Sequence, residues 1–181
     1  MFLKGNNISL RALEPSDADL LYRWENNQAL WPVSYTQVPF SKFILDEFTN
    51  AAYSDIYTNK QLRLMVAKTT PKADGSAETI GIADLFEFDP QHHRTGLGIY
   101  IEESFRKSGC ALESIELLKA YCFKTLLLKQ IFVHVSASNT ASIGLFEKAG
   151  FEKSGLKKCW IKTGLNTFED VWFMQIINNG D

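Results

Sequence analysis

The stretch from Gly98 to Phe123 constrains the fold more than any other part of this 181-residue chain. It begins with an apolar run suited to a strand, Ile99-Tyr100-Ile101, and continues through a short polar loop at residues 106–111. Apolar residues then recur at helical spacing, at Ala111, Ile115, Leu118, Cys122 and Leu126. The stretch therefore predicts a strand, a loop of small residues and an amphipathic helix in succession.

The loop has the features of a phosphate-binding site. Free backbone N–H groups and the dipole at a helix N-terminus attract anions. Gly109 can adopt dihedral angles closed to other residues, and Arg106 and Lys107 add positive charge. An ordinary polar turn capped by Ser108 has the same spacing, so the pattern alone leaves both interpretations open.

Three segments resemble motifs of the GNAT (Gcn5-related) N-acetyltransferases. Arg106-x-x-Gly109-x-Ala111, between a strand and a helix, is similar to the family's acyl-CoA pyrophosphate loop. Residues 139–151 resemble the second family motif, Asn-x-x-Ala/Ser-x-x-x-Tyr-x-x-x-Gly-Phe. Residues 8–13 and 17–20 resemble the start of the RimJ/RimL-type branch, which includes spermidine acetyltransferases. The motifs span nearly the whole chain in the family's order.

Composition narrows the class of protein. At 181 residues, we expect one domain covering residues 1–181. A net charge of −2 without a basic stripe argues against a nucleic-acid binder. Three cysteines without CxxC spacing argue against a disulfide framework or a zinc site and suit a reducing cytoplasm. The first residues do not form a basic segment followed by an apolar one, and no run of eighteen apolar residues is present. We therefore expect neither a signal peptide nor a membrane span.

The chain predicts an α+β fold with the element order β-α-α-β-β-β-α-β-α-β-β and a mixed sheet. Predicted helices include one begun by Ser16 as its cap and one over residues 41–53, with Phe43 or Ile44 on its apolar side. The family resemblance implies a single-domain, three-layer fold. Its twisted, mostly antiparallel sheet would have a V-shaped splay between two strands and helices on both faces. The aromatic residues Trp31 and Tyr35, which lie on either side of Pro32, could cover the core or line the substrate pocket.

The resemblance also implies acetyl-CoA as cosubstrate. The main chain of Ile99, Tyr100 and Ile101 would pair with the pantetheine arm. Asn139 would contact the pantetheine amide, although its position also suits an ordinary helix cap. The remaining residues expected at the cofactor are Arg106, Lys107, Ser108, Gly109, Cys110, Ala111, Ser142 and Phe146. We expect no metal, because the adjacent His92 and His93 would point to opposite faces of a strand and no acidic or Cys partner sits at ligand spacing.

The catalytic positions depart from the family pattern. Phe146 stands where the family carries the tyrosine that protonates the leaving thiolate. Gly96 stands where the spermidine-acetylating relatives carry a glutamate, and Gln37 and Val38 replace their acidic residues before the proline matching Pro39. These departures disfavour polyamines as acceptors.

Other residues of the chain could replace the missing acid and base. Ser142 is the best replacement acid, because RimL-like relatives use a serine hydroxyl, although a small packed residue would look the same. Asp84 and Glu87, three apart on a strand, should face opposite sides, and Glu87 is slightly favoured as the base. His93 is a weaker base candidate, and Tyr100 could be an acid or a pocket wall.

The leading interpretation is an acetyl-CoA-dependent N-acetyltransferase of the RimJ/RimL type. It would act by direct attack of a primary amine, from a small molecule or a protein N-terminus, on the thioester. The alternative is a catalytically weak acyl-CoA-binding or regulatory protein that kept the cofactor cleft. We expect no nucleic-acid or membrane partner, and a homodimer is compatible with the sequence.

Overall fold

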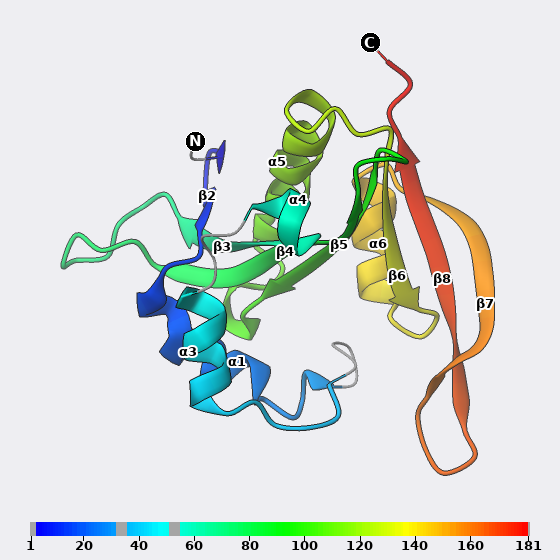
Figure 1. Cartoon of the computed structure of the whole chain (residues 1–181), viewed down its shortest axis with the longest axis horizontal. Helices are drawn as coiled ribbons and strands as arrows, with labels where there is room; N and C mark the ends of the chain where they lie inside the picture. Colours follow the sequence, from blue (N-terminus) through cyan, green and yellow to red (C-terminus); the bar gives the residue numbers. More distant parts are fainter. Residues whose placement is uncertain (1–2, 32–35, 51–54, 181) are drawn as a thin grey trace.

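The computed structural model describes residues 3–31, 36–50 and 55–180, and its centre is one eight-stranded sheet with the order β1-β2-β3-β4-β5-β6-β8-β7 (Figure 1). Neighbouring strands are antiparallel except β5 and β6, which are parallel. The predicted α+β fold with a mixed, mostly antiparallel sheet is confirmed. The strands are β1 (Leu3–Lys4), β2 (Ile8–Ala12), β3 (Leu62–Lys68), β4 (Thr79–Asp89), β5 (Arg94–Ile101), β6 (Gln130–Ser136), β7 (Glu152–Lys162) and β8 (Phe168–Ile177).

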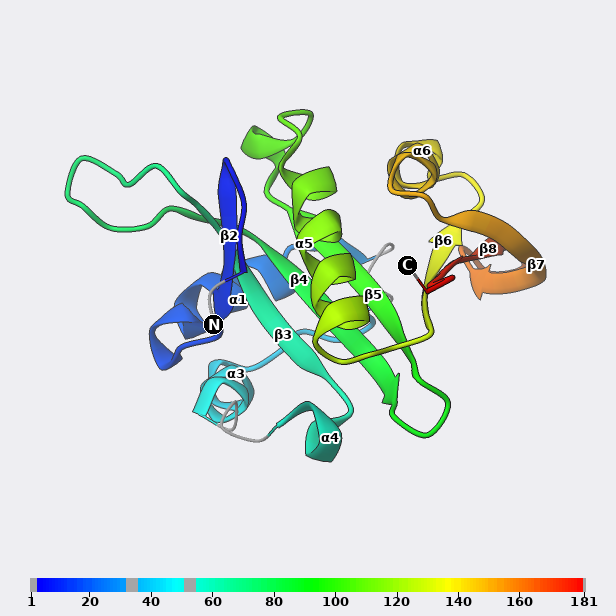
Figure 2. The same cartoon turned by 90° about the horizontal axis from the view of Figure 1, so that it is seen from above.

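Helices cover both faces of the sheet, which confirms the three-layer arrangement (Figure 2). On β3, Leu64 and Val66 belong to the larger core beneath α5 and α6, whereas Met65 belongs to a smaller core beneath α1 and α3. A strand buried on both faces has no polar side, which explains the nearly continuous apolar sequence of β3. The helices are α1 (Ala18–Glu25), α3 (Lys42–Asn50), α4 (Ile56–Asn59), α5 (Cys110–Lys124) and α6 (Thr140–Lys148), with 3-10 turns η1 (Pro15–Asp17) and η3 (Glu103–Phe105).

The sheet splits between its two parallel strands. Strands β5 and β6 pair only at Arg94↔Gln130, Thr95↔Ile131 and Gly96↔Phe132, although β5 continues to Ile101 and β6 to Ser136. Figure 1 shows the consequence, with β3 to β5 running across the view and β6, β8 and β7 running down it. The V-shaped splay implied by the resemblance is therefore present, with its apex at Gly96 and Phe132.

Several local predictions were wrong. Glu14, not Ser16, is the N-cap of η1, and its side chain forms a capping box with Asp17. In α3, Phe43 and Ile44 are exposed, whereas Leu45 and Thr49 are buried. The very short β1 and α4 were not predicted, because two to four residues are too few to show a periodicity. Pro32, Tyr35 and the last three residues of the helix predicted over residues 41–53 lie outside the described residues.

A β-bulge interrupts β4. The pairing passes from Phe86↔Gly96 to Asp89↔Arg94, so β4 has one residue more than β5 in this interval. Glu87, inside the bulge, has a φ of 49°. As a result, Leu85 and Phe88 both face the larger core although they are three residues apart. The regular alternation on which the expectation for Asp84 and Glu87 rested therefore does not hold across this interval.

Candidate active site

The loop before α5 leaves the N-terminus of that helix open. Gly109 is the N-cap with a φ of 83°, and no side chain in the described parts of the chain caps the first turn. The Ser108 hydroxyl instead donates to the carbonyl oxygen of Phe105 at 2.5 Å, so the interpretation of Ser108 as a cap is wrong. A Cβ on Gly109 would meet no atom within 4 Å, so this glycine is required by its backbone conformation and the space beside it is open.

The other loop residues differ in whether their side chains or only their backbone groups could bind a ligand. Arg106 Nε donates to the carbonyl oxygen of Ile101 at 3.1 Å, which ties the loop to the end of β5. Lys107 is exposed and has a φ of 61°. The Cys110 side chain is buried and Ala111 packs against the larger core, so these two can contribute only backbone groups.

The end of β5 presents different groups to the two faces of the sheet. Ile99 and Ile101 pack in the larger core, while Tyr100 lies in the smaller core with its ring 5.3 Å from that of Trp24. Burial, reinforced by the charge of Glu102, raises the pKa of the Tyr100 phenol. Tyr100 therefore forms part of the wall on the α1 face and keeps its proton at neutral pH.

Helix α6 begins beside the splay. The Asn139 side chain accepts a hydrogen bond from the Ser142 backbone N–H at 3.1 Å, which confirms the predicted cap. Ser142 is half-buried. Phe146 is only 5% exposed and its ring lies 5.2 Å from that of Phe151 in an edge-on contact.

Ion pairs occupy the face beneath α1 and α3, which we call the acceptor face. Arg63 lies between Asp84, at 2.9 and 2.7 Å, and Glu25, at 2.6 Å. Burial disfavours the charged guanidinium, but the two carboxylates outweigh it and raise the pKa of Arg63. The Arg63 guanidinium also lies 5.4 Å from the ring centre of Phe48. The carboxylate of Asp84 is thus already engaged by Arg63.

Close packing explains why position 96 is a glycine. A Cβ there would approach the Phe86 ring to 2.3 Å, so this ring occupies the space that a side chain at position 96 would need. Phe86 in turn makes an edge-on contact with Phe132 at 6.1 Å. Aromatic rings therefore cover the apex of the splay on the acceptor face.

His134 was missed by the sequence reasoning. It lies on β6 two residues beyond the last pairing with β5, and its ring is 5.6 Å from that of Phe132 and 5.5 Å from that of Phe173. Lys157 Nζ lies 3.1 Å from His134 Nε2. Burial and then the charge of Lys157 lower the pKa of His134, and Glu87 opposes them. A histidine inside an otherwise apolar strand was the available signal.

The two base candidates named from the sequence, Glu87 and His93, sit in different surroundings. Glu87 is exposed at the bulge in β4, close enough to influence His134. His93 lies in the turn before β5, where its Nδ1 is 3.1 Å from the carbonyl oxygen of Leu127. His93 is thus at the closed end of the splay, on the far side of the three β5–β6 pairs.

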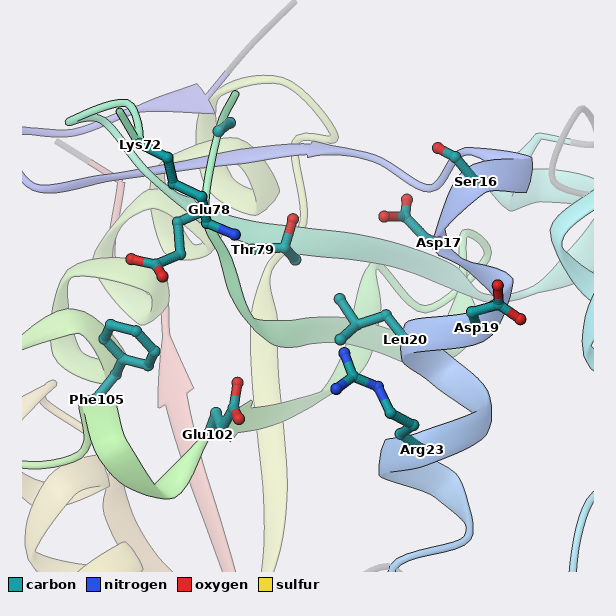
Figure 3. A pocket seen from close by; sticks show the side chains of 11 residues that line it. Ser16, Asp17, Asp19, Leu20, Arg23, Lys72, Glu78, Thr79, Glu102 and Phe105 are labelled. Atoms are coloured by element: carbon teal, nitrogen blue, oxygen red, sulfur yellow. The ribbon is translucent and has the colours of Figure 1, made fainter. Parts of the chain in front are cut away.

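A separate depression of about 380 Å³ lies between α1, the β3–β4 connection and η3 (Figure 3). Figure 3 shows Arg23 and Glu102 pointing into it from opposite sides. Its carboxylates Asp17 and Asp19 are already paired with Arg11 and Lys42. Glu102 lies six residues beyond Gly96, roughly 20 Å along an extended strand, so this depression is remote from the apex of the splay.

Among the residues that the structure describes, no group of three or more His, Cys, Asp and Glu side chains could hold a metal ion. None of the helices in those parts of the chain has the length and apolar character needed to cross a membrane.

Comparison with known proteins agrees with this geometry. The family model described as "Acetyltransferase (GNAT) domain" matches residues 7–152. Spermidine N(1)-acetyltransferase of Vibrio cholerae is 27% identical over 151 residues, covering 83% of this chain and 82% of that protein. The probable N-acetyltransferase YjcK of Bacillus subtilis is 25% identical, covering 99% of this chain and 98% of that protein.

Solved structures give the same result. The crystal structure of the Vibrio cholerae spermidine N-acetyltransferase in complex with CoA and spermine has a TM-score of 0.79 at 26% identity. The match covers 94% of this chain and 95% of that chain. With the splayed sheet, the open helix N-terminus and the family match in place, the chain belongs to the GNAT acetyltransferase family and is an acetyl-CoA-dependent N-acetyltransferase.

Proposed function

We propose that this enzyme is of the RimJ/RimL type, works in the cytoplasm and acetylates a primary amine of a small molecule or a protein N-terminus by direct attack on the thioester. The observation that carries the proposal is the gap between β5 and β6, which leads from the uncapped N-terminus of α5 to the apex at Gly96. Strands from both ends of the chain complete this one sheet, which supports treating residues 1–181 as one acyltransferase domain.

The cofactor placement follows from the length of β5. Amides of the loop at residues 107–111 would hold the pyrophosphate, assisted by Arg106 and Lys107. The arm would then run back along β5 by hydrogen bonding to the strand edge that β6 leaves unpaired. From Ile101 to Gly96 is about 16 Å of extended strand, which would bring the thioester near the apex. Asn139, Ser142 and Phe146 of the second motif would border the arm on the α6 side.

The charges on the acceptor face favour an acceptor with one amine over a polyamine. A polyamine needs several carboxylates, and here Arg63 already engages Glu25 and Asp84. Lys157 adds a positive charge beside Phe173, and aromatic rings floor the apex. The solved Vibrio cholerae relative was crystallised with spermine. This chain retains the fold but surrounds the apex with rings and matched charges, which suits an apolar or aromatic monoamine.

Proton transfer is divided between the two sides of the splay. Ser142 is proposed as the donor to the leaving thiolate, because α6 places it three residues after Asn139 and its side chain is half-buried. Glu87 is proposed to assist the base side, where its charge opposes the lowering of the His134 pKa.

A pair of glycine substitutions tests the cofactor assignment. Gly109→Glu should weaken CoA binding at least about 100-fold, because it adds bulk and negative charge where the pyrophosphate would lie. Gly75→Glu is the matched control, since Gly75 also has a positive φ, of 81°, and open space around its Cβ, but lies in the β3–β4 connection. Calorimetric titration of both folded variants with CoA measures the difference.

Equal CoA affinity of the two variants would contradict the assignment. Release of CoA in the presence of an amine panel then separates the enzyme from the alternative of a binding protein. A wild-type protein that binds CoA tightly and acetylates none of the amines would support the weak acyl-CoA-binding alternative.

A further inference from the structure

We propose that His134 is the general base that accepts the proton from the acceptor amine as it attacks the thioester. This role rests on the proposed function, because it requires the acyl group to lie at the apex between β5 and β6.

The strand register places His134 at the mouth of the splay. Phe132 is the last β6 residue paired with β5, opposite Gly96, so His134 is the next β6 residue on the same face. On β5 the corresponding residue is Gly98, where a Cβ would have only ordinary contacts, at 3.7 Å or more. A histidine on one strand thus faces a glycine on the other, which leaves room for a reacting group between them.

The imidazole also points to the acceptor face. Its neighbours along the strand, Val133 and Val135, belong to the larger core under α5 and α6. His134 instead contacts Phe132 and Phe173 on the opposite face and is half-buried. An amine approaching between these rings would reach the ring nitrogens of His134 before the core.

The contact with Lys157 fixes the tautomer. A lysine ammonium has three donors and no acceptor, so at 3.1 Å it donates to Nε2 and the ring proton lies on Nδ1. The lone pair of Nε2 is therefore already bonded to a primary alkylammonium. An acceptor amine has the same head group, so it can replace Lys157 at this nitrogen.

The surroundings keep the imidazole neutral. Among the described residues, the charged groups that act on it are Lys157 from β7 and Glu87 from β4; β8 contributes the uncharged Phe173. Burial and Lys157 lower the pKa of His134 from 6.5, with Glu87 opposing. At neutral pH the ring is thus in its unprotonated, proton-accepting form.

The neutral amine nitrogen forms a bond to the carbonyl carbon, and one N–H proton passes to Nε2 of His134. The C–S bond breaks, and the thiolate takes a proton from water or from the Ser142 hydroxyl, which then regains a proton from water. The imidazolium returns its proton to solvent, so the sum is amine plus acetyl-CoA to amide plus CoA.

The test compares pH profiles of kcat/KM between pH 5 and 8.5. The probes are 2-phenylethylamine, spermidine and a peptide with a free N-terminal serine. With one proton to lose from the amine and one from the imidazolium, log kcat/KM for the two alkylamines should rise with a slope of about 2 below the His134 pKa and about 1 above it. For the peptide, whose α-amino group titrates at about pH 7.7–8.0, the rise should level off near that pH. His134→Gln should lower kcat about 100-fold and give a slope of about 1 throughout for the two alkylamines.

Three variants serve as controls. His134→Phe keeps the ring packing without a base and should lose activity as His134→Gln does, which separates catalysis from folding. His93→Gln should leave the profile unchanged, because His93 lies at the closed end of the splay. Lys157→Met should move the break in slope to higher pH, since Lys157 lowers the pKa of His134. Lys158→Met, an exposed neighbour on the same strand, should not move it.

The outcomes are separable. Unchanged kcat and a retained slope of 2 in His134→Gln, with an active wild type, would overturn the role of His134 and leave the proposed function intact. A wild type that acetylates none of the three probes overturns both. Loss of activity in His93→Gln with full activity in His134→Gln would assign the base to His93.

Discussion

The cofactor side and the acceptor side of the splay differ in how far their polar groups are already satisfied. At the N-terminus of α5, the described residues provide no side-chain cap, and the space beside Gly109 is open. On the acceptor face, Arg63 is bonded to two carboxylates and Lys157 to His134. The first region has unsatisfied donors suited to an anion, whereas the second must release or displace existing contacts to bind a charged ligand. The difference explains why the cofactor is easier to assign than the acceptor.

The largest effect on this difference between the two sides is expected from removing the guanidinium of Arg63 on the acceptor face. Arg63→Met leaves Glu25 and Asp84 without their cation, and we expect a loss of about 3 kcal/mol in the free energy of unfolding. The three side chains are only 15–20% exposed, so solvent replaces the guanidinium poorly. Urea unfolding measures the loss. Lys42→Met is the control, since its pair with Asp19 is exposed and should leave the urea midpoint nearly unchanged. Equal urea midpoints for the two variants would show that the ion pairs of Arg63 with Glu25 and Asp84 contribute little to the stability of the fold.

A change at Ser142 would sharpen the contrast on the cofactor side. Ser142→Ala should lower kcat at least about 10-fold while CoA affinity changes little, because it removes a proton donor and leaves the helix cap at Asn139 in place. Pre-steady-state kinetics should confirm that chemistry limits the rate. Ser154→Ala removes an exposed hydroxyl on β7 and should retain full kcat. If Ser142→Ala behaves in the same way, the thiolate is protonated by water, Tyr100 or the substrate.

The helix cap itself gives a smaller effect. Asn139→Ala should destabilise the protein by about 1 kcal/mol through loss of the cap on α6, and should also raise the KM for acetyl-CoA. Asp55→Ala is the matched control, because Asp55 caps α4 in the same way by accepting from Thr58 N at 2.8 Å. Thermal unfolding and KM are measured together. A KM increase shared by both variants would show that Asn139 acts on the cofactor only through overall stability.

Restoring the family tyrosine should have the smallest effect. Phe146→Tyr places a hydroxyl on a side chain that is buried against Phe151, and with Ser142 as donor we expect kcat to change less than about threefold. Phe151→Tyr adds a hydroxyl to the other ring of the pair and reports the cost of burying it. A tenfold rise in kcat in Phe146→Tyr alone would show that the wild-type enzyme lacks an effective acid.

The parts that the sequence could predict are those encoded locally. Gly109 and the apolar spacing of α5 lie within one short stretch, so the loop and helix were predictable from that stretch alone. The regular alternation assumed for Asp84 and Glu87 failed at a bulge, because strand register depends on the partner strand and not on residues 84–87 alone. His134 was missed because its partner Lys157 lies 23 residues away and is brought close only by the pairing of β6, β8 and β7. Phe43 and Ile44 show the same limit on α3, where tertiary packing selected Leu45 and Thr49 instead.

Strand β7 forms one edge of the sheet, and its sequence decides how copies of the protein can meet. Lysines stand at positions 153, 157, 158 and 162 of its eleven residues. Two such edges placed side by side would bring like charges together along the strands, which opposes both sheet extension and edge-to-edge aggregation. Pairing of two β7 edges is therefore disfavoured as a contact between copies of this chain.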